Sequence, residues 1–223
     1  MKSNEEWFPY SVSMTEQIYL KLKDLIVKEQ LIPGQKLGHE DLSKILNVSH
    51  TPIREALNRL VQEGFVSKVL RRGYYLNEIK VDEAEELYIF RETIEQYTIE
   101  NAITSKDTTL ERDLMAIMKK YQCEIQKGMS VERRQVDREF HLRITEASGN
   151  RFVKKTLEQI FDRLILKRRL EGFIQRGKEV YEEHEILLEC LRKKDRGKAK
   201  ETMRNHIRKG MENFLKHYRP KQP

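Results

Sequence analysis

Hydrophobic residues near the start of the chain recur every three or four positions, and this spacing predicts short helices. The first helix follows Thr15, a good N-cap, and is stopped by Pro33 and Gly34. The second ends near Asn47, a residue suited to left-handed backbone. The apolar positions of this second helix are Leu42, Ile45 and Leu46. Residues 1–13 lack any such period, so we expect a flexible N-terminal arm there.

A third helix and a β-hairpin follow directly. Ser49 or Thr51 can cap the helix, and Pro52 suits its first turn. Gly64 stops it. Its apolar stripe consists of Ile53, Ala56, Leu57, Leu60 and Val61. In "FVSKVLRRGYYLNEI" apolar residues alternate on both sides of an Arg-Arg-Gly turn, which predicts a hairpin. These elements together predict a winged helix-turn-helix domain over residues 14–78.

The rest of the chain has helical periodicity throughout. Helices are expected at 82–104, 107–128, 131–147, 151–171, 174–194 and 195–217. Asp82 is the expected N-cap of the first of them, and the clearest breaks are "SGN" at 148–150 and "KKDRG" at 193–197. These helices predict a second domain over residues 79–219, an all-α bundle. The expected fold class is therefore mainly α.

Composition limits where such a chain can act. The chain has 223 residues, and no apolar run approaches the roughly 20 residues that a membrane-spanning helix needs. Its first residues lack the apolar core of a signal peptide. Two cysteines, Cys123 and Cys190, are too few for a disulfide framework. We therefore expect a cytoplasmic protein that makes no membrane contact.

Net charge alone does not locate a nucleic-acid surface. The chain carries a formal charge of +7, but residues 1–78 contribute only +1 and residues 79–223 contribute +6. Local arrangement is more informative. Residues 50–76 hold five Lys/Arg and only two acids, Glu55 and Glu63. The case for DNA binding therefore rests on where these cations lie in the winged domain.

The second helix of a helix-turn-helix presents its N-terminal residues to base edges in the major groove. Here those residues are Ser49, His50, Thr51 and Arg54. Arg54 has the fork geometry to bind guanine O6 and N7, and Arg59 lies farther along, where a phosphate contact is expected. The expected wing contacts are Lys68, Arg71, Arg72 and Gly73.

A solvated charged face is the alternative for these residues. In that case Arg54 would merely pair with Glu55, with Asn58 or with a neighbouring helix. A single arginine would favour this interpretation. A basic recognition helix followed by a basic wing instead predicts binding to double-stranded DNA.

Three of the six histidines fall inside apolar stripes of the second domain, on three different helices. They are His141, His184 and His206, and Asp137 precedes His141 by one helical turn. One aspartate and three histidines suit a divalent ion such as Zn, Ni, Mn or Fe. A buried histidine is, however, more often a core residue satisfied by one hydrogen bond. Spacing alone leaves both interpretations open.

The stretch "NVSHTPIREALNRLVQEGFV", followed by "RRGYYL", resembles the DNA-binding domain of the GntR family of bacterial transcription regulators. The match to the family's "VSRTPVREAL" segment comprises Val48, Ser49, Thr51, Pro52, Arg54, Glu55, Ala56 and Leu57. His50 stands where the family usually has arginine, and Asp41 stands where an arginine is common. Both changes remove positive charge from positions that touch DNA in relatives. The resemblance implies DNA binding and leaves the operator sequence open.

Three later segments resemble the FCD ligand-binding domain of the FadR subfamily. They are "ELYIFRETIEQYTIENA", "VDREFHLRITEASGN" and "EEHEILLECLRKKDRGKAKETMRNHI". Some FCD members bind a metal through the Asp and His of a "DxxFH" segment and two later histidines. The resemblance therefore implies that Asp137, His141, His184 and His206 are metal ligands. Zinc is the first candidate, with nickel, manganese and iron as alternatives.

The same resemblance implies a small organic acid as effector, with its carboxylate completing the metal coordination. Arg91 and Arg163 are the candidates to hold its far end, whereas ion pairs with Glu95, Glu158 or Asp162 are the alternative. The expected protein is a homodimeric regulator, most simply a repressor, that reads a palindromic operator. Effector binding would change its affinity for DNA.

Two other roles for a metal remain open from the sequence. The metal could itself be the signal, or it could only stabilise the fold. A helical metalloenzyme is the third possibility, because an open coordination position could activate water. The sequence has no HExxH motif, no nucleophile motif and no evident second carboxylate near the ligands. We therefore expect no enzyme.

Overall fold

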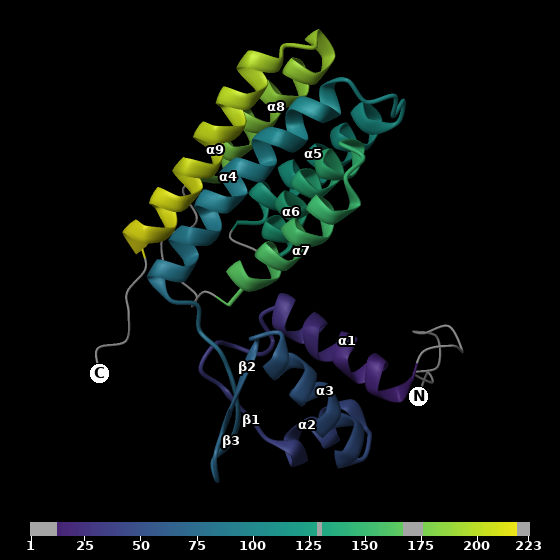
Figure 1. Ribbon diagram of the computed structural model, residues 1–223, viewed down its shortest axis with the longest axis vertical. Coiled ribbons are helices and arrows are strands. Elements are labelled where there is room, and N and C mark those ends of the chain that lie inside the picture. The colour runs from purple at the N-terminus through teal and green to yellow at the C-terminus, as the bar shows by residue number, and fades with distance from the viewer. Residues whose placement is uncertain (1–12, 129–130, 167–175, 218–223) are drawn as a thin grey trace. The chain divides into compact units, whose positions relative to one another are not determined.

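A computed structural model describes residues 13–128, 131–166 and 176–217 (Figure 1). The chain divides into two compact units: of the described residues, the first contains those up to Glu78 together with Ile165 and Leu166, and the second contains the others. The described residues are mostly helical, with one small sheet, so the mainly α fold class is confirmed. Apart from Ser13, the expected N-terminal arm lies outside the described residues, as do 167–171 of the expected fourth helix of the second domain.

The first unit is a winged helix-turn-helix, as predicted. Its elements are α1 (Met14–Val27), β1 (Lys36–Leu37), α2 (His39–Leu46), α3 (His50–Gln62), β2 (Val66–Val69) and β3 (Gly73–Leu76). Helices α1 and α2 both pack on α3. The antiparallel sheet has the order β1-β3-β2. The short strand β1 was not predicted; it pairs Lys36 with Tyr75 and Leu37 with Tyr74.

Local side-chain chemistry sets the ends of these helices. Ser13, not Thr15, is the N-cap of α1, because the Ser13 hydroxyl accepts a hydrogen bond from the Glu16 N–H at 3.2 Å. Asn47 ends α2 in the left-handed region, with φ of 52°, as expected. Gly64 follows α3 with φ of 76°, a conformation that favours glycine.

The core of the first unit consists of apolar residues from all three helices and the sheet. Its largest fully buried side chains are Leu22, Leu42, Ile53, Leu57, Leu60 and Leu76. Ile45, which was predicted to lie in the apolar stripe of α2, is instead 61% exposed. The reason is that the two-turn helix α2 buries only Leu42 against the rest of the unit.

The second unit contains the six predicted helices. They are α4 (Val81–Ile103), α5 (Leu110–Gln126), α6 (Val131–Ala147), α7 (Arg151–Leu164), α8 (Gly177–Lys193) and α9 (Arg196–His217). The prediction of Asp82 as a cap was wrong, because Lys80 is the N-cap and Asp82 lies in the first turn. Helix α5 begins later than expected because the Asp107 carboxylate accepts from the Thr109 N–H at 2.9 Å, in a turn before the helix.

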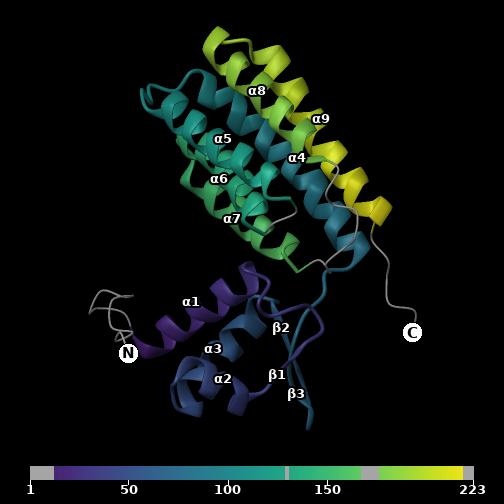
Figure 2. The same ribbon diagram turned by 180° about the vertical axis from the view of Figure 1, so that it is seen from behind.

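Helix α4 is the centre of this bundle. Figures 1 and 2 show it running beside α9 for most of its length, and it also contacts α6, α7 and α8. Helix α5 packs on α6 and α8. Phe140, Ile144 and Phe214 are fully buried in the resulting core. Among the described residues, no helix has both the length and the hydropathy that a membrane crossing requires.

Candidate metal centre and nucleic-acid interface

Four side chains from three helices converge inside the second unit. Asp137 and His141 come from α6, His184 from α8 and His206 from α9. One potential ligand atom of each residue lies within 4.8 Å of those of the other three. The histidine side chains are buried, whereas 28% of the Asp137 side chain is exposed. The structure thus brings together all four residues that the sequence singled out.

Two of the three imidazoles are oriented by buried carboxylates. His141 Nδ1 donates to Glu95 on α4, and His206 Nδ1 donates to Glu183 on α8 at 2.7 Å. Arg91 in turn donates through Nε to the other oxygen of Glu95 at 2.7 Å. These contacts hold both rings by the same nitrogen and leave Nε2 facing the cluster.

Cations keep both carboxylates ionised despite their burial. Burial alone would raise the pKa of Glu95, but Arg91 and His141 lower it to about 2. Burial likewise acts to raise the pKa of Glu183, and its hydrogen bond from His206, together with Lys209 and Arg176, lowers it to about 2.

The third imidazole is oriented by packing. The ring of His184 stacks on Phe140, with centroids 3.9 Å apart and planes 10° from parallel. Burial, reinforced by His206 and His141, holds the pKa of His184 well below its usual 6.5. Burial also lowers the pKa of His206, against the raising effect of its hydrogen bond to Glu183. Both imidazoles are therefore neutral near pH 7, the form that can bind a metal.

Ring nitrogens and a carboxylate oxygen face one another at the centre of the cluster. His206 is neutral and donates through Nδ1, so its Nε2 atom carries a lone pair, and this atom faces His141 Nε2. These two Nε2 atoms are only 3.1 Å apart. His184 Nε2 and Asp137 Oδ1 lie 3.5 Å apart, buried and without a hydrogen-bond partner among the described residues. A cation bound at the centre of the cluster would give the unsatisfied His184 Nε2 and Asp137 Oδ1 a partner.

The donor set fits a first-row divalent ion. Two ligand atoms bound to zinc at about 2.1 Å lie about 3.0–3.4 Å apart for right-angled to tetrahedral geometry. The 3.1 Å separation of the two Nε2 atoms falls within this range, and the 3.5 Å separation of His184 and Asp137 lies at its edge. Three imidazoles and one carboxylate could therefore close on such an ion with small movements.

In the first unit, the residues predicted to contact DNA lie on two exposed features. Ser49 is the N-cap of α3, and the side chains at the start of this helix are exposed: His50, Thr51 and Arg54. The wing exposes Lys68 on β2 and Arg71 and Arg72 in the turn between β2 and β3. Gly73 adopts φ of 101° at the end of this turn, which only glycine readily tolerates.

Positive charge gathers between these two features. The His39 ring lies 6.2 Å from the His50 ring and 5.4 Å from the Tyr74 ring, measured between centroids. Burial, first, and then the charges of His50, Arg54 and Lys68 lower the pKa of His39. The start of α3 and the wing therefore share one positive field, as a surface for phosphates requires.

Arg59 lies differently from the other predicted DNA contacts. It donates to Glu16 of α1 and, through Nε, to Glu63 at 3.2 Å. Its guanidinium carbon also lies 3.6 Å from the centre of the Tyr19 ring. These contacts hold α1 against α3. To contact a phosphate, Arg59 would have to break these contacts. Its role in DNA binding stays a prediction.

Family models match both units. Residues 14–76 match "Bacterial regulatory proteins, gntR family", and residues 86–209 match "FCD domain". The chain belongs to the gntR family of bacterial regulators. Its first unit is thus the DNA-binding domain of a transcription regulator, and its second unit is an FCD domain.

Known relatives agree with this assignment. The uncharacterized HTH-type transcriptional regulator YdhC of Bacillus subtilis is 28% identical over 208 residues, which is 90% of each chain. The HTH-type transcriptional repressor GlaR of Escherichia coli is 26% identical over 85% of this chain and 90% of its own length. The solved structure of E. coli McbR/YncC has a TM-score of 0.83 at 25% identity, covering 93% of this chain and all of its own. These similarities indicate a regulator rather than an enzyme.

The structure corrects one step of the sequence argument about this gntR-family regulator. Two carboxylates that the sequence did not reveal, Glu95 and Glu183, lie beside the cluster. Glu183 directly precedes His184, but neighbouring helical residues point about 100° apart, so it reaches His206 instead. With pKa values of about 2 and bonds to histidines and cations, these carboxylates are poor bases for activating water.

The two arginines predicted to hold an effector are both engaged in ion pairs. Arg91 is 6% exposed and pairs with Glu95, which was the alternative considered for it. Arg163 donates to Glu83 of α4, with its Nε at 2.9 Å. Effector contact by either residue stays a prediction.

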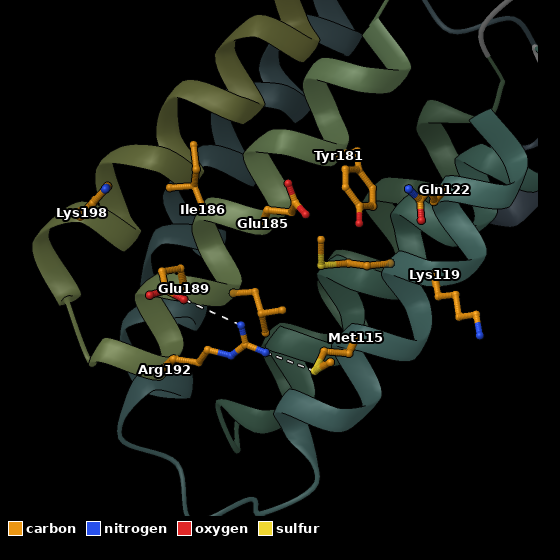
Figure 3. A pocket seen from close by; sticks show the side chains of 11 residues that line it. Met115, Lys119, Gln122, Tyr181, Glu185, Ile186, Glu189, Arg192 and Lys198 are labelled. Carbon is orange, nitrogen blue, oxygen red and sulfur yellow. Dashed lines mark hydrogen bonds and ion pairs between the residues drawn. The ribbon is translucent and has the colours of Figure 1, made fainter. Parts of the chain in front are cut away.

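A hollow of about 530 Å³ lies between α5 and α8 (Figure 3). Its walls mix apolar side chains such as Met115 and Ile186 with charged ones. Arg192 is paired with Glu189 at its edge and contacts Met115 Sδ at 3.2 Å. None of the four clustered residues lines this hollow.

Proposed function

We propose that this gntR-family regulator binds a palindromic operator as a homodimer and that a small organic acid, held at a divalent metal ion in the FCD domain, controls its affinity for DNA. Zinc is the first candidate, with nickel, manganese and iron as alternatives. The observation that carries the metal is the convergence of His184 Nε2 and Asp137 Oδ1, buried, 3.5 Å apart and without a hydrogen-bond partner among the described residues, with the facing Nε2 atoms of His141 and His206.

The charges around the cluster support an anionic effector. Glu95 is balanced by Arg91, and Glu183 is balanced by Arg176, with Nη2 2.9 and 3.0 Å from its oxygens. Asp137 is then the one ligand that contributes a charge of its own, so a divalent ion would leave the site positive. A carboxylate that enters beside the partly exposed Asp137 would neutralise this charge and complete the coordination.

The proposed DNA contacts divide into two groups. Arg54 would read a guanine edge, and Ser49, His50 and Thr51 would contact bases or phosphates beside it. The wing residues would hold the backbone or enter the minor groove: Lys68, Arg71, Arg72 and Gly73. We propose repression as the sense of regulation, supported by the relative GlaR, which is named as a repressor.

Coupling between the two units would use α4. Its Glu95 bonds to the proposed ligand His141, and only four residues separate the end of β3 at Leu76 from the start of α4 at Val81. A ligand that repositions His141 therefore acts on the helix that leads out of the DNA-binding unit. The effector must bind one DNA-affinity state of the protein more tightly than the other for this coupling to operate.

A structural metal is the second candidate role. The burial of all three histidines, with side-chain exposures of 0%, 1% and 7%, suits an ion that only ties α6, α8 and α9 together. The two roles differ in their effect on DNA binding. A structural ion would stabilise the fold without making operator affinity respond to acids.

Operator affinity tests the proposal. An operator fragment would be selected from a random-sequence DNA pool, and its dissociation constant measured by fluorescence anisotropy for zinc-loaded protein with and without a panel of small carboxylates. We expect at least one acid to change this constant about 5–150-fold, and the His184→Ala variant to lose the response. A wild type that binds zinc but responds to no acid would contradict the effector role. An affinity that follows zinc concentration alone would identify the metal as the signal.

A further inference from the structure

His39 lies where three elements of the winged unit meet. It is the first residue of α2, and the centroid of its ring lies 6.2 Å from that of His50 on α3 and 5.4 Å from that of Tyr74 on β3. Its Nε2 atom is buried and has no hydrogen-bond partner among the described residues. Buried polar atoms normally have such a partner, because the loss of hydration is otherwise costly. The His39 ring therefore has a hydrogen-bonding position left for a ligand.

The proximity of His39 and His50 brings the N-terminal ends of two helices together. Each is the first residue of its helix, and side chains tilt toward the N-terminal end of a helix. Gly38 has no side chain with which to cap α2, and within the described part of the chain the Ser49 side chain does not cap α3. Backbone N–H groups at such ends are available to an anion, and the helix dipole favours negative charge there.

Cations surround this junction on the remaining sides. Arg54 of α3 and Lys68 of β2 both act on His39 through their charges. Lys68 Nζ also lies 5.5 Å from the centre of the Tyr74 ring, and β1 adds the exposed Lys36. We call the side chains of His39, His50, Lys68 and Tyr74 the His39 cluster.

The acids of the adjoining helices point elsewhere or have partners. Glu40 and Asp41 follow His39 on α2, and successive side chains of a helix diverge by about 100°. On α3, Glu55 accepts a hydrogen bond from the Thr15 hydroxyl of α1 at 2.6 Å. Positive charge therefore predominates where the two histidine rings and the two helix ends meet.

We propose that the His39 cluster binds one phosphate of the operator backbone and that His39 takes up a proton when it does so. The proposal rests on the proposed binding to operator DNA and adds to it a phosphate contact and a dependence on pH. The first helix of a helix-turn-helix crosses the DNA backbone, which would bring a phosphate to the start of α2. This phosphate would accept a hydrogen bond from protonated His39 and lie beside His50 and Lys68, while Arg54 keeps its guanine contact.

The direction of the pH effect follows from the charges around His39. In the protein without DNA, burial first, and then the charges of His50, Arg54 and Lys68, lower the pKa of His39. A phosphate beside the ring would offset these cations and raise the pKa in the complex. Between the two pKa values the complex holds one more proton than the protein alone. Operator affinity should therefore fall as pH rises through this range.

The dependence of operator affinity on pH tests the proposal. The dissociation constant for the selected operator fragment would be measured by fluorescence anisotropy from pH 6.0 to 8.0, at constant salt, with the zinc-loaded full chain. In the wild type we expect this constant to rise about three- to tenfold, the effect of up to one proton. His39→Gln should remove most of the rise, because glutamine does not titrate. Effects of pH that originate in the FCD domain are common to both proteins and cancel in the comparison.

A phosphate contact also differs from a base contact in its dependence on sequence and salt. At pH 6.0, His39→Gln should weaken binding to the operator and to DNA of unrelated sequence by the same factor. The slope of log affinity against log salt should become shallower by about 1. His50→Gln is the matched control, because it replaces the histidine at the same position of α3; this variant should retain the fall in affinity with pH. Melting curves would verify that both variants are folded.

The possible results distinguish this proposal from the proposed function. A wild type that selects no operator would contradict DNA binding itself. A wild type that binds its operator with the same affinity at all pH values, or a His39→Gln variant that keeps the full pH effect, would overturn only the proposal for His39. If His50→Gln alone removes the pH effect, the proton is bound by His50 instead. A His39→Gln variant with altered base preference would indicate a base contact and overturn the phosphate contact.

Discussion

Two carboxylates decide which nitrogen of each imidazole faces the proposed metal. Glu95 and Glu183 accept from the Nδ1 atoms of His141 and His206, so Nε2 is left as the coordinating atom. A carboxylate acceptor also makes the imidazole a stronger ligand. At the scale of single residues, the affinity for metal should therefore depend on side chains that never touch the ion.

Replacing Glu183 by glutamine should weaken metal binding about 10–100-fold, because an amide makes the His206 ring less basic and can donate to Nδ1 instead of accepting. The zinc dissociation constant would be measured by competition with a chromophoric chelator. Glu179→Gln is the matched control: its side chain is 60% exposed on the same helix and also pairs with Arg176. Equal losses in the two variants would contradict the positioning role of Glu183.

The buried histidines should also make the metal-free protein sensitive to acid. The pKa values of His184 and His206 are lowered in the folded state, so below pH 6.5 the unfolded chain binds more protons than the folded one. Glu95 and Glu183, with pKa values of about 2, act in the same direction below about pH 4.5. The free energy of unfolding should thus fall as pH decreases from 7.5 to 5.5 and again toward 3.

Thermal unfolding of chelator-treated protein, followed by circular dichroism, measures this effect. The midpoint temperature should be lower at pH 5.5 than at pH 7.5, and the difference should shrink in His184→Gln. A midpoint that rises on acidification would contradict the assignment of neutral, buried imidazoles.

At the scale of elements, the sequence predicted those helices and strands whose hydrophobic residues repeat at a regular spacing. All six helices of the second unit and the winged helix-turn-helix are confirmed, because a face that packs on a core repeats regularly. The predicted positions of the helix ends were less accurate. Whether Ser13 or Thr15 caps α1 depends on which hydroxyl meets a free N–H, and no repeat encodes that choice.

The candidate metal site could likewise be predicted from the sequence only in part. Asp137 and His141 are one helical turn apart, so their proximity could be predicted, and the family resemblance implied the other two ligands. Glu95 lies 46 residues before His141, and Glu183 lies 23 residues before His206. Contacts over such separations depend on how whole helices pack, which single-chain patterns do not specify. The carboxylates therefore became evident only in the folded bundle.

Within helix α3, two arginines should have different roles. Arg54 is exposed at the N-terminal end, whereas Arg59 is held by Glu16, Glu63 and the Tyr19 ring. Arg54→Ala should cost about 1–3 kcal/mol in operator affinity and relax base preference at one position of each half-site. Arg59→Ala should instead lower the thermal stability of the winged unit and leave base preference unchanged.

Binding to a set of operator variants, each with one base pair changed, distinguishes these effects. If Arg59→Ala relaxes base preference while Arg54→Ala does not, the assignment of the two arginines is reversed. Melting curves of both variants complete the comparison, since only Arg59→Ala removes contacts between α1 and α3.

At the scale of the whole molecule, helix α4 follows the winged domain in the chain and runs through the second unit. The DNA-binding unit exposes cations at the start of α3 and in the wing, and the FCD domain brings four potential metal ligands together. On its buried side, helix α4 contributes Arg91 and Glu95 to the network around the cluster. Metal and effector would thus both act on the helix that follows the winged domain. Reciprocity requires that operator DNA change effector affinity by the same factor as effector changes operator affinity.

The presence of a metal at the cluster is the central claim, and elemental analysis tests it most directly. Protein purified without a metal-affinity tag would be compared with His184→Ala and with His39→Ala, a histidine control in the other unit. We predict close to one equivalent of a divalent transition metal per chain in the wild type and in His39→Ala, and almost none in His184→Ala. Absence of metal from all three, even after soaking with zinc, nickel or manganese, would contradict the site and leave the four residues as a polar pocket.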